Sequence, residues 1–448
     1  MKYFGTDGIR GTYGDKEISE PFFGALAKAA VDVLRENGGG KIVVGGDTRA
    51  STDALKGAFC KSLAEAGAQF EDLGVLPTPA LAYGVLARKA SMGAMITASH
   101  NPYTDNGIKF FDSLARKVED DVQLRIEESI EKYLPDFSDY KPAVFPSRVI
   151  AAGKFASEEY AKKMASIFPK DFLKGMKIAI DMANGATSKI SSKVFREYGA
   201  EVFEIGCEPT GLNINDSVGS QHPQKMAELC KTSGACVGFA HDGDGDRVVV
   251  ADETGSILDG EEILGLIAID ALNRGRLSSN SIVTTVQSNM GLDESLRESG
   301  VKVYRSGIGD RLVMREMIAQ NCCIGGENSG HFIFSEISPC GDGLAAALAV
   351  LSVMKQKGGK LSALRGGIRM YPQISKAVAV ARKTPVQEAP NLSKAIEKCS
   401  EIFGKEGRLL VRYSGTEKKI RLLAEGKNPE KVAECIQILQ KAVEIDLQ

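Results

Sequence analysis

Short apolar runs alternate along this chain with longer stretches of helical spacing. The runs lack the strict apolar–polar alternation of a half-exposed strand, which predicts strands that are covered on both faces. These predicted strands lie at residues 41–45, 94–97, 177–180, 237–240 and 282–286. The predicted helices lie at residues 54–66, 122–134, 188–198, 261–272 and 344–355. Such alternation is typical of parallel, doubly wound α/β sheets.

The pattern also suggests where domains begin and end, since 448 residues are too many for one ordinary domain. Residues 135–146 contain three prolines and resemble a connector. From about residue 371 the pattern changes to hairpin-like strands and helices. We therefore expect three α/β domains followed by a smaller C-terminal α+β domain. Their predicted ranges are residues 1–150, 151–254, 255–368 and 369–448.

Composition and charge exclude several classes of function. The 56 Lys and Arg nearly cancel the 58 Asp and Glu, so no net field favours nucleic acid or an anionic membrane as a partner. The first residues lack the pattern of a signal peptide, and the longest apolar run, 344–354, is too short to span a membrane. The nine cysteines form no CxxC pair, which is typical of a reduced, cytoplasmic protein.

The first segment that carries chemistry is residues 97–109, TASHNPYTDNGIK. It follows a predicted buried strand, and α/β proteins place ligands at the carboxyl ends of such strands. Ser99 offers a hydroxyl that could attack phosphorus, and Lys109 could act as acid/base or hold a phosphate. A Ser-His pair alone is more often part of an ordinary polar loop, but the longer string is far more specific.

The second segment is HDGDGDR at residues 241–247. Asp242, Asp244 and Asp246 offer hard oxygen ligands suited to Mg²⁺, and the glycines allow the backbone to curl around an ion. A calcium-binding EF-hand is an alternative, since Glu253 falls at its twelfth position. However, Arg247 stands where an EF-hand requires glycine, and a strand-like run follows instead of a helix. A solvated acidic turn is the other alternative.

Two further segments suggest a sugar phosphate. GGENSGH at residues 325–331 offers Glu327 and Ser329 to sugar hydroxyls and contains His331, which titrates near neutrality, although a glycine-rich hairpin would look similar. RYSGTEKKIR at residues 412–421 could form a phosphate nest, or it could be a hairpin turn with surface charges. Three of the four histidines fall within the four segments, which favours one shared site.

These four strings resemble the α-D-phosphohexomutase superfamily. Residues 4–11, 211–215 and 288–292 are similar to its phosphoglucosamine mutase branch, and the resemblance extends in order from residue 4 to about residue 425. The resemblance implies an α/β fold of four domains around a central cleft. The first three domains would share related mixed sheets sandwiched by helices.

The resemblance also implies a role for each matching residue. Ser99 would carry the phosphoryl group and, with Asp242, Asp244 and Asp246, would bind Mg²⁺. Arg10, Lys109 and His331 would lie beside the reacting groups. The residues expected to bind substrate are Arg247, Asp310, Arg311, Glu327, Ser329, Arg412, Ser414, Gly415, Thr416 and Arg421.

The reaction implied is the interconversion of glucosamine 6-phosphate and glucosamine 1-phosphate, a precursor of bacterial cell-wall amino sugars. The reaction would pass through a sugar bisphosphate intermediate, and a sugar 1,6-bisphosphate would act as activator. A homodimer is one possible assembly of the chain. Two positions depart from the family pattern: Lys418 replaces a proline, and Asn328 replaces a glutamine beside the sugar contacts. A phosphomannomutase or phosphoglucomutase is therefore the nearest alternative, with a phosphatase or a calcium-binding module more distant.

Overall fold

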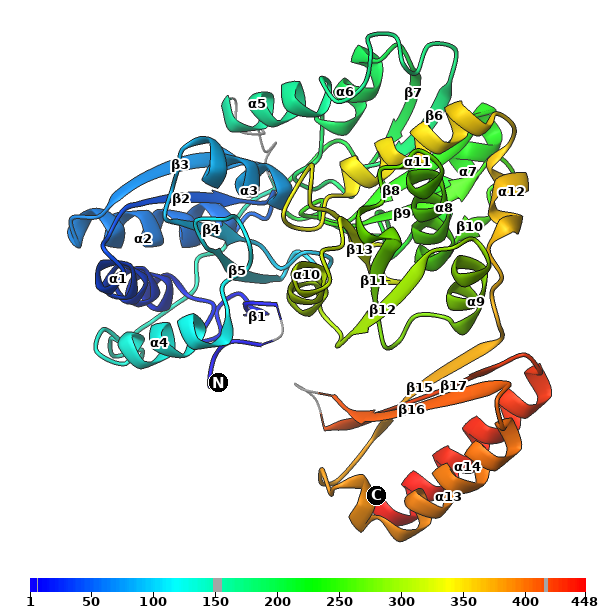
Figure 1. The fold of residues 1–448 in the computed structure, drawn as a ribbon. Helices are drawn as coiled ribbons and strands as arrows, with labels where there is room; N and C mark the ends of the chain where they lie inside the picture. Colours follow the sequence, from blue (N-terminus) through cyan, green and yellow to red (C-terminus); the bar gives the residue numbers. More distant parts are fainter. Residues whose placement is uncertain (6, 148–154, 415–417) are drawn as a thin grey trace.

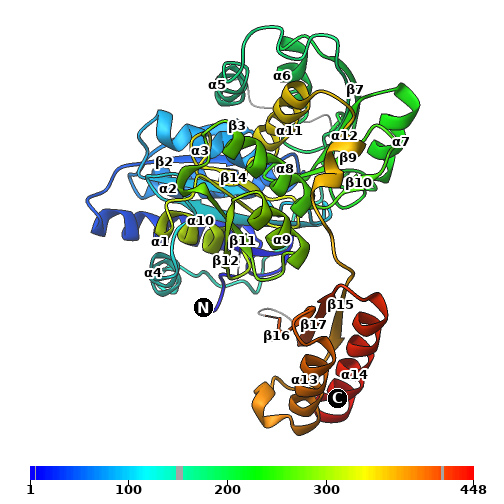
Figure 2. The same cartoon turned by 45° about the vertical axis from the view of Figure 1, so that its right-hand side comes forward.

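The computed structural model describes residues 1–5, 7–147, 155–414 and 418–448. Its strands form four sheets, one after another along the chain. Figures 1 and 2 show the first three sheets and their helices together in one larger body. The last sheet and its two helices stand apart below this body, joined to it through β15. The expected fold of three α/β units and a smaller C-terminal α+β unit is confirmed.

The first sheet is mixed, as the resemblance implies, whereas the strand–helix alternation alone indicates parallel strands. Its strands, in spatial order, are β1 (Ile9–Thr12), β5 (Asp105–Phe111), β4 (Met92–Ile96), β2 (Lys41–Gly46) and β3 (Gln69–Val75). Strands β2, β3 and β4 are parallel, whereas β5 runs antiparallel to both β4 and β1. Strand direction depends on how the chain returns to the sheet, and the residues of one strand do not show it.

Both faces of this sheet are covered, as the unbroken apolar runs predict. In β2, Val43 belongs to one buried cluster, while Ile42 and Val44 belong to the cluster on the opposite face. The helices of this part of the chain are α1 (Glu20–Glu36), α2 (Thr52–Glu65), α3 (Thr78–Ala87) and α4 (Asp120–Ile130).

The second and third sheets repeat this plan. The second contains β10 (Ile257–Leu258), β9 (Val248–Asp252), β8 (Val237–His241), β6 (Lys177–Asp181) and β7 (Glu201–Ile205), in that spatial order. Because β10 belongs to it, this sheet extends past residue 254. The third contains β12 (Lys302–Ser306), β11 (Ser281–Thr285), β13 (Ile324–Gly326) and β14 (Phe332–Phe334). The helices that accompany these two sheets are α5 (Phe155–Met164), α6 (Ser191–Glu197), α7 (Gln224–Ser233), α8 (Gly260–Asn273), α9 (Met290–Glu298), α10 (Asp310–Ala319), α11 (Gly343–Lys357) and α12 (Leu361–Leu364), with 3-10 turns at Ser278–Asn280 and Arg365–Gly367.

The C-terminal unit has a core of its own. Its antiparallel sheet has the order β15 (Gln373–Ala379), β17 (Lys419–Gly426), β16 (Gly407–Tyr413), packed against α13 (Pro390–Phe403) and α14 (Pro429–Leu447), with a 3-10 turn at Val386–Glu388. Arg408 and Glu425, paired at 2.8 Å, connect this unit to the third. Arg408 donates to the carbonyl oxygens of Val286 (2.8 Å) and Ser288, and the amide of Met290 donates to Glu425. Within the described ranges, no helix is both long and apolar enough to cross a membrane.

One position recurs in all four sheets. The three segments containing Ser99, the aspartates and Glu327 each occupy the turn between two antiparallel strands: β4 and β5, β8 and β9, and β13 and β14. The described residues of the fourth segment lie at the adjoining ends of β16 and β17, which also pair antiparallel. The first three of these segments are in contact, since Ser99 donates to Asp242 and Arg247 forms a β-bridge with His331.

Candidate active site

Ser99 lies three residues beyond the end of β4 and is fully buried. Its φ of 52° is in the left-handed region, which non-glycine residues rarely adopt and which is often found at functional sites. The Ser99 amide donates to Thr97 Oγ1 (2.9 Å), and the Ser99 hydroxyl donates to Asp242 Oδ2 (2.6 Å). The predicted nucleophile and the predicted metal loop are therefore in direct contact.

Arg49, which was not predicted from the sequence, fixes the position of the Ser99 loop. Its side chain is fully buried and paired with Asp47 at 2.9 Å. Its guanidinium donates to the carbonyl oxygens of Ser99 (3.0 Å), Asn101 (2.8 Å), Asp105 (3.0 Å) and Pro102. Asp47 also accepts from the Thr97 hydroxyl at 2.7 Å, so one carboxylate orients both groups that fix the Ser99 backbone.

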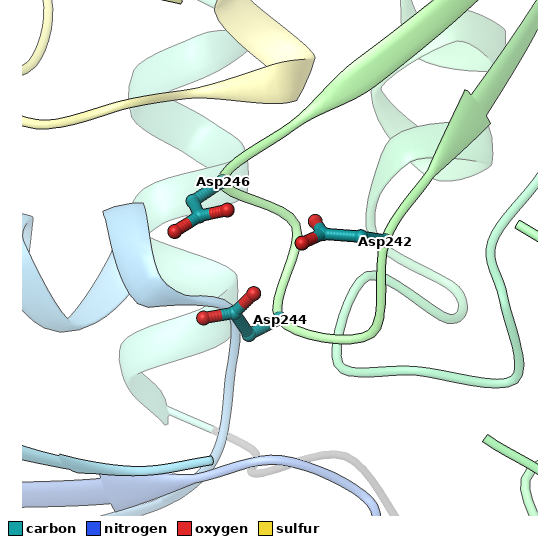
Figure 3. A group of neighbouring side chains, drawn as sticks. All are labelled: Asp242, Asp244 and Asp246. Carbon is teal, nitrogen blue, oxygen red and sulfur yellow. The ribbon is translucent and has the colours of Figure 1, made fainter. Parts of the chain in front are cut away.

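The three aspartates of the second segment converge on one point (Figure 3), and one carboxylate oxygen from each lies within 4.8 Å of the other two. All three are buried. The Oδ1 atoms of Asp244 and Asp246 are buried and accept no hydrogen bond in the described part of the chain. The loop requires glycine at Gly243, where a Cβ atom would lie 2.6 Å from the carbonyl oxygen of Ser99.

This cluster has the electrostatics of a cation site. Burial and the neighbouring Asp246 and Asp244 raise the pKa of Asp242 well above its usual value. Lys109 Nζ lies 2.8 Å from Asp244 and 3.1 Å from Asp246. Burial opposes the charge of Lys109, but Asp244, Asp246 and Asp7 outweigh it and hold the lysine pKa well above its usual value. Buried carboxylate oxygens without donors are suitable ligands for a divalent cation such as Mg²⁺.

The EF-hand alternative does not fit this geometry. The loop joins two strands, β8 and β9, instead of two helices. Glu253, which would be the twelfth-position ligand, is bonded to the amide (3.3 Å) and hydroxyl of Ser362. A calcium-binding module of that type is therefore excluded.

Opposite charges alternate around a closed circuit beside the aspartates. We call the set Asp7, Lys109, Asp246, His331, Asp310 and Lys117 the charged ring. Its contacts run from Lys109 to Asp7 (3.4 Å) and Asp246 (3.1 Å), from Lys117 to Asp7 and to Asp310 (2.7 Å), and from His331 to Asp310 (3.3 Å) and Asp246 (3.7 Å). Asp7 and Lys117 were not predicted, since neither lies in the four segments.

The ring determines the protonation of His331. Burial opposes its charge, but Asp246 and Asp310 outweigh burial and raise the histidine pKa above its usual value. In contrast, burial together with Arg247 and Arg10 lowers the pKa of His100 to about 4, so its neutral ring accepts from Arg247 at 2.8 Å. Arg10 forms an ion pair with Asp7. The structure thus brings Arg10, Arg247 and His331 around the same carboxylates.

The other predicted residues of the third unit differ in burial and in the partners that they contact. Glu327 Oε1 accepts from the Gly309 amide at 3.0 Å, and Ser329 and Asn328 are exposed at the tip of the turn. Arg311 is paired with Asp120 of the first unit at 2.6 Å. Its guanidinium therefore links two units, whereas Asp310 belongs to the charged ring.

The predicted phosphate nest is described in part. Arg412 of β16 stands directly opposite Arg421 of β17, which places two like charges side by side. Burial and Arg421 lower the pKa of Arg412. Ser414 is buried, and its carbonyl oxygen accepts from Lys383 at 2.7 Å. Gly415 and Thr416 lie outside the described residues.

Sequence comparison links the whole chain to known proteins. Residues 1–136, 158–255 and 259–371 match the phosphoglucomutase/phosphomannomutase α/β/α domains I, II and III, and residues 376–441 match the C-terminal domain of the same family. A phosphoglucosamine mutase of Nitratidesulfovibrio vulgaris is 40% identical over 451 residues, covering 100% of this chain and 99% of the relative. One from Aeromonas hydrophila is 41% identical over 444 residues, covering 99% of each.

Structural comparison gives the same fold. A phosphoglucomutase/phosphomannomutase family protein from Burkholderia thailandensis superimposes with a TM-score of 0.81 at 22% identity, covering 99% of this chain and 97% of the other. At that identity the likeness concerns the fold alone.

Proposed function

Because this chain belongs to the phosphoglucomutase/phosphomannomutase family, in its phosphoglucosamine mutase branch, we propose that it interconverts glucosamine 6-phosphate and glucosamine 1-phosphate through a phosphorylated Ser99. Membership makes it an isomerase that transfers a phosphoryl group within one molecule. The observation that best supports the proposed route is the 2.6 Å contact between the Ser99 hydroxyl and Asp242. This contact places the proposed nucleophile directly beside the proposed cation site, and both groups are buried.

In the first half-reaction, a sugar hydroxyl attacks the phosphorus carried by Ser99. The bond from phosphorus to Ser99 Oγ breaks as the bond to the sugar oxygen forms, which gives the sugar bisphosphate. The sugar hydroxyl loses a proton and Ser99 Oγ gains one. We assign this exchange to Lys109, which the carboxylates keep protonated: its ammonium donates the proton that Ser99 Oγ gains, and the amine left behind accepts the proton of the sugar oxygen, with His331 beside the reacting sugar. The second half-reaction reverses these steps with the other phosphoryl group.

Asp242, Asp244 and Asp246 would hold Mg²⁺, and the Oδ1 atoms of the last two, which accept no hydrogen bond from the described residues, support this assignment. When bound, the ion neutralises charge on the transferring phosphoryl group. The Nε–H groups of Arg10 and Arg247 are buried and have no acceptor in the described residues. We assign them to phosphoryl oxygens, which would satisfy these donors.

Arg412 and its neighbours would hold the phosphate that is not being transferred. The Arg412 Nε–H is likewise buried without an acceptor among the described residues, and an anion between Arg412 and Arg421 would relieve their repulsion. Ser414, Gly415 and Thr416 complete this proposed set, while Glu327 and Ser329 would contact sugar hydroxyls. Between half-reactions the bisphosphate must turn round, so that each phosphate visits both places.

The finer features of the prediction are also proposals. A sugar 1,6-bisphosphate would restore the phosphate on Ser99 whenever the intermediate escapes. None of the nine cysteines is paired, which supports a reducing, cytoplasmic location. A homodimer stays a prediction, and light scattering coupled to size-exclusion chromatography would test it.

The deciding experiment follows turnover by phosphorus NMR. Wild-type protein with Mg²⁺ and a trace of glucose 1,6-bisphosphate is given glucosamine 6-phosphate, glucose 6-phosphate or mannose 6-phosphate separately. We expect the glucosamine substrate to be converted fastest. Faster conversion of another sugar phosphate would mean that the exposed turn at Asn328 selects that sugar instead. Ser99→Ala should abolish conversion while the far-UV circular dichroism stays unchanged. Wild-type turnover by this variant would rule out the phosphoserine route.

A further inference from the structure

A cavity of about 220 Å³ lies between the first unit and α10 of the third. It is separate from the aspartate cluster, although Lys117 and Asp310 of the charged ring form part of its wall. Figure 1 shows α10 next to the first unit, where the Arg311–Asp120 ion pair joins them. The charged residues that line the cavity are Arg116, Lys117, Arg311 and Arg315, opposed by Asp112, Glu119 and Asp310.

Arg116 distinguishes this cavity from an ordinary surface network. Lys117, Arg311 and Arg315 each have a carboxylate partner. Across the described ranges, no carboxylate forms an ion pair with Arg116, and its Nε–H is buried without an acceptor. Asp112, four residues earlier, accepts from the amides of Leu114 and Arg116 at 2.9 Å each, so its Oδ1 atom is already used in holding the turn.

The Nε–H of Arg311 is also buried and lacks an acceptor in the described part of the chain. Arg116 and Arg311, which come from different units, thus line one cavity, and each has an Nε–H that lacks a protein acceptor within the described ranges. Buried donors of this kind are normally satisfied by water or by a ligand. Arg10, Arg247 and Arg412, which the proposed function assigns to phosphate groups, share this property, as does Arg274 of the third unit.

We propose that this cavity binds a small dianion of the phosphate class, held by Arg116 and Arg311, and that the bound anion links the first and third units. Guanidinium groups donate in a fork that matches a tetrahedral oxyanion. The volume is below that of ordinary cofactor pockets, which favours inorganic phosphate or a small phosphate ester over a nucleotide.

Binding there has a consequence for turnover, and this part rests on the proposed function. An anion that contacts both units stabilises them in their docked arrangement. The sugar bisphosphate must turn round between half-reactions, which requires room in the cleft. Phosphate in the cavity should therefore slow turnover even when substrate saturates the active site, whereas phosphate in the active site would be displaced by substrate.

Binding is measured first, by isothermal titration of inorganic phosphate into full-length protein. Arg412→Gln serves as the background, because it weakens the proposed phosphate nest. Adding Arg116→Gln should lower the remaining phosphate affinity at least tenfold. Adding Arg297→Gln, which removes the same charge from exposed α9, should leave it unchanged. Equal affinities in the two double variants would overturn the proposal and leave a water-filled cavity.

Kinetics then test the regulatory part. Without phosphate, Arg116→Gln should retain the wild-type kcat and KM. With phosphate, the wild type should keep a residual inhibition at saturating glucosamine 6-phosphate that Arg116→Gln lacks. Purely competitive inhibition in both proteins would overturn the regulatory part. If no sugar phosphate is converted by any variant, the proposed function has failed, and the titration still decides the binding site.

Discussion

At the scale of single residues, catalytic geometry here depends on side chains that have no chemical role of their own. Ser99 adopts its left-handed backbone because Arg49 binds four carbonyl oxygens of the surrounding loop, and Asp47 orients Arg49 and Thr97 together. The sequence identifies Ser99 by its motif. It does not identify Arg49, because most arginines are exposed, and burial of this one cannot be predicted until its partners are known.

Arg49→Lys tests this positioning role. Lysine keeps the charge but cannot reach four carbonyl oxygens from one planar group. We expect kcat to fall by roughly 100-fold, the loss typical of small misplacements of reacting groups, with a smaller change in KM. Steady-state kinetics and the rate at which glucose 1,6-bisphosphate phosphorylates Ser99 would measure it. Arg35→Lys, at an exposed helix end, is the matched control, and equal kinetics in both variants would contradict the role.

Asp244→Asn tests the cation site. Its Oδ1 atom is buried and accepts no hydrogen bond from the described residues, so replacing the carboxylate by an amide removes a charged ligand. The Mg²⁺ concentration for half-maximal rate should rise by at least about tenfold, in line with the sensitivity of metal sites to ligand changes. Titrating Mg²⁺ against the initial rate gives this number. Asp216→Asn, exposed in the same unit, should behave as the wild type.

At the scale of elements, hydrophobic patterning locates most strands and helices. Each predicted strand overlaps an observed one, and the predicted helices at residues 261–272 and 344–355 lie within α8 and α11. Strand β1 was missed because four residues with a central arginine and glycine carry no apolar run. The antiparallel direction of β5 was missed because it depends on how the chain returns to pair with β4, which the residues of β5 alone do not show.

The residue that caps helix α11, Asp342, has a shifted pKa that the sequence does not reveal. Asp342 caps the helix by accepting from the Ala345 amide at 2.9 Å, and the Tyr160 hydroxyl donates to it at 2.8 Å. Burial raises the pKa of Asp342 to about 6, from 3.8. A raised carboxyl pKa means that the folded state holds the proton more tightly. Its stabilisation is complete below pH 3.8 and is lost as the pH rises to about 6.

Comparison of Asp342→Asn with the wild type isolates this effect, since asparagine can still cap the helix. The stability of the wild type relative to the variant should fall between pH 4 and pH 6 by roughly 3 kcal/mol, and stay level above pH 7. Thermal unfolding at a series of pH values would show it. A difference that does not change with pH would mean that Asp342 keeps its ordinary pKa.

At the scale of the whole molecule, the C-terminal unit is attached to the third unit largely through a few polar contacts. Glu425 is fully buried, and Arg408 reaches both Glu425 and the backbone at residues 286–288. The sequence could not show this attachment, because its members lie more than a hundred residues apart and neither is part of a motif. The position of the proposed phosphate nest depends on it.

Arg408→Ala should therefore weaken substrate binding more than chemistry. Removing the arginine leaves the buried Glu425 without its cation, a loss of about 1.5–3 kcal/mol for hydrogen bonds to charged groups. We expect KM for the sugar phosphate to rise by roughly tenfold or more, with a smaller change in kcat. Steady-state kinetics would separate the two. Lys441→Ala, exposed on α14, is the control, and a fall in kcat alone would show that this attachment does not position the nest.

The charged ring also bears on how the protein is made. The first unit supplies Lys109, Lys117 and Asp7, whereas the second and third supply Asp246, Asp310 and His331. A ribosome releases the two lysines together with Asp7, but long before Asp246 and Asp310, the other two carboxylates of the ring. Domains generally fold as they emerge, so the first unit must balance two cations with one carboxylate and water until the later units dock. The candidate active site is therefore among the last parts of the molecule to form, because the charged ring stays incomplete until His331 has emerged.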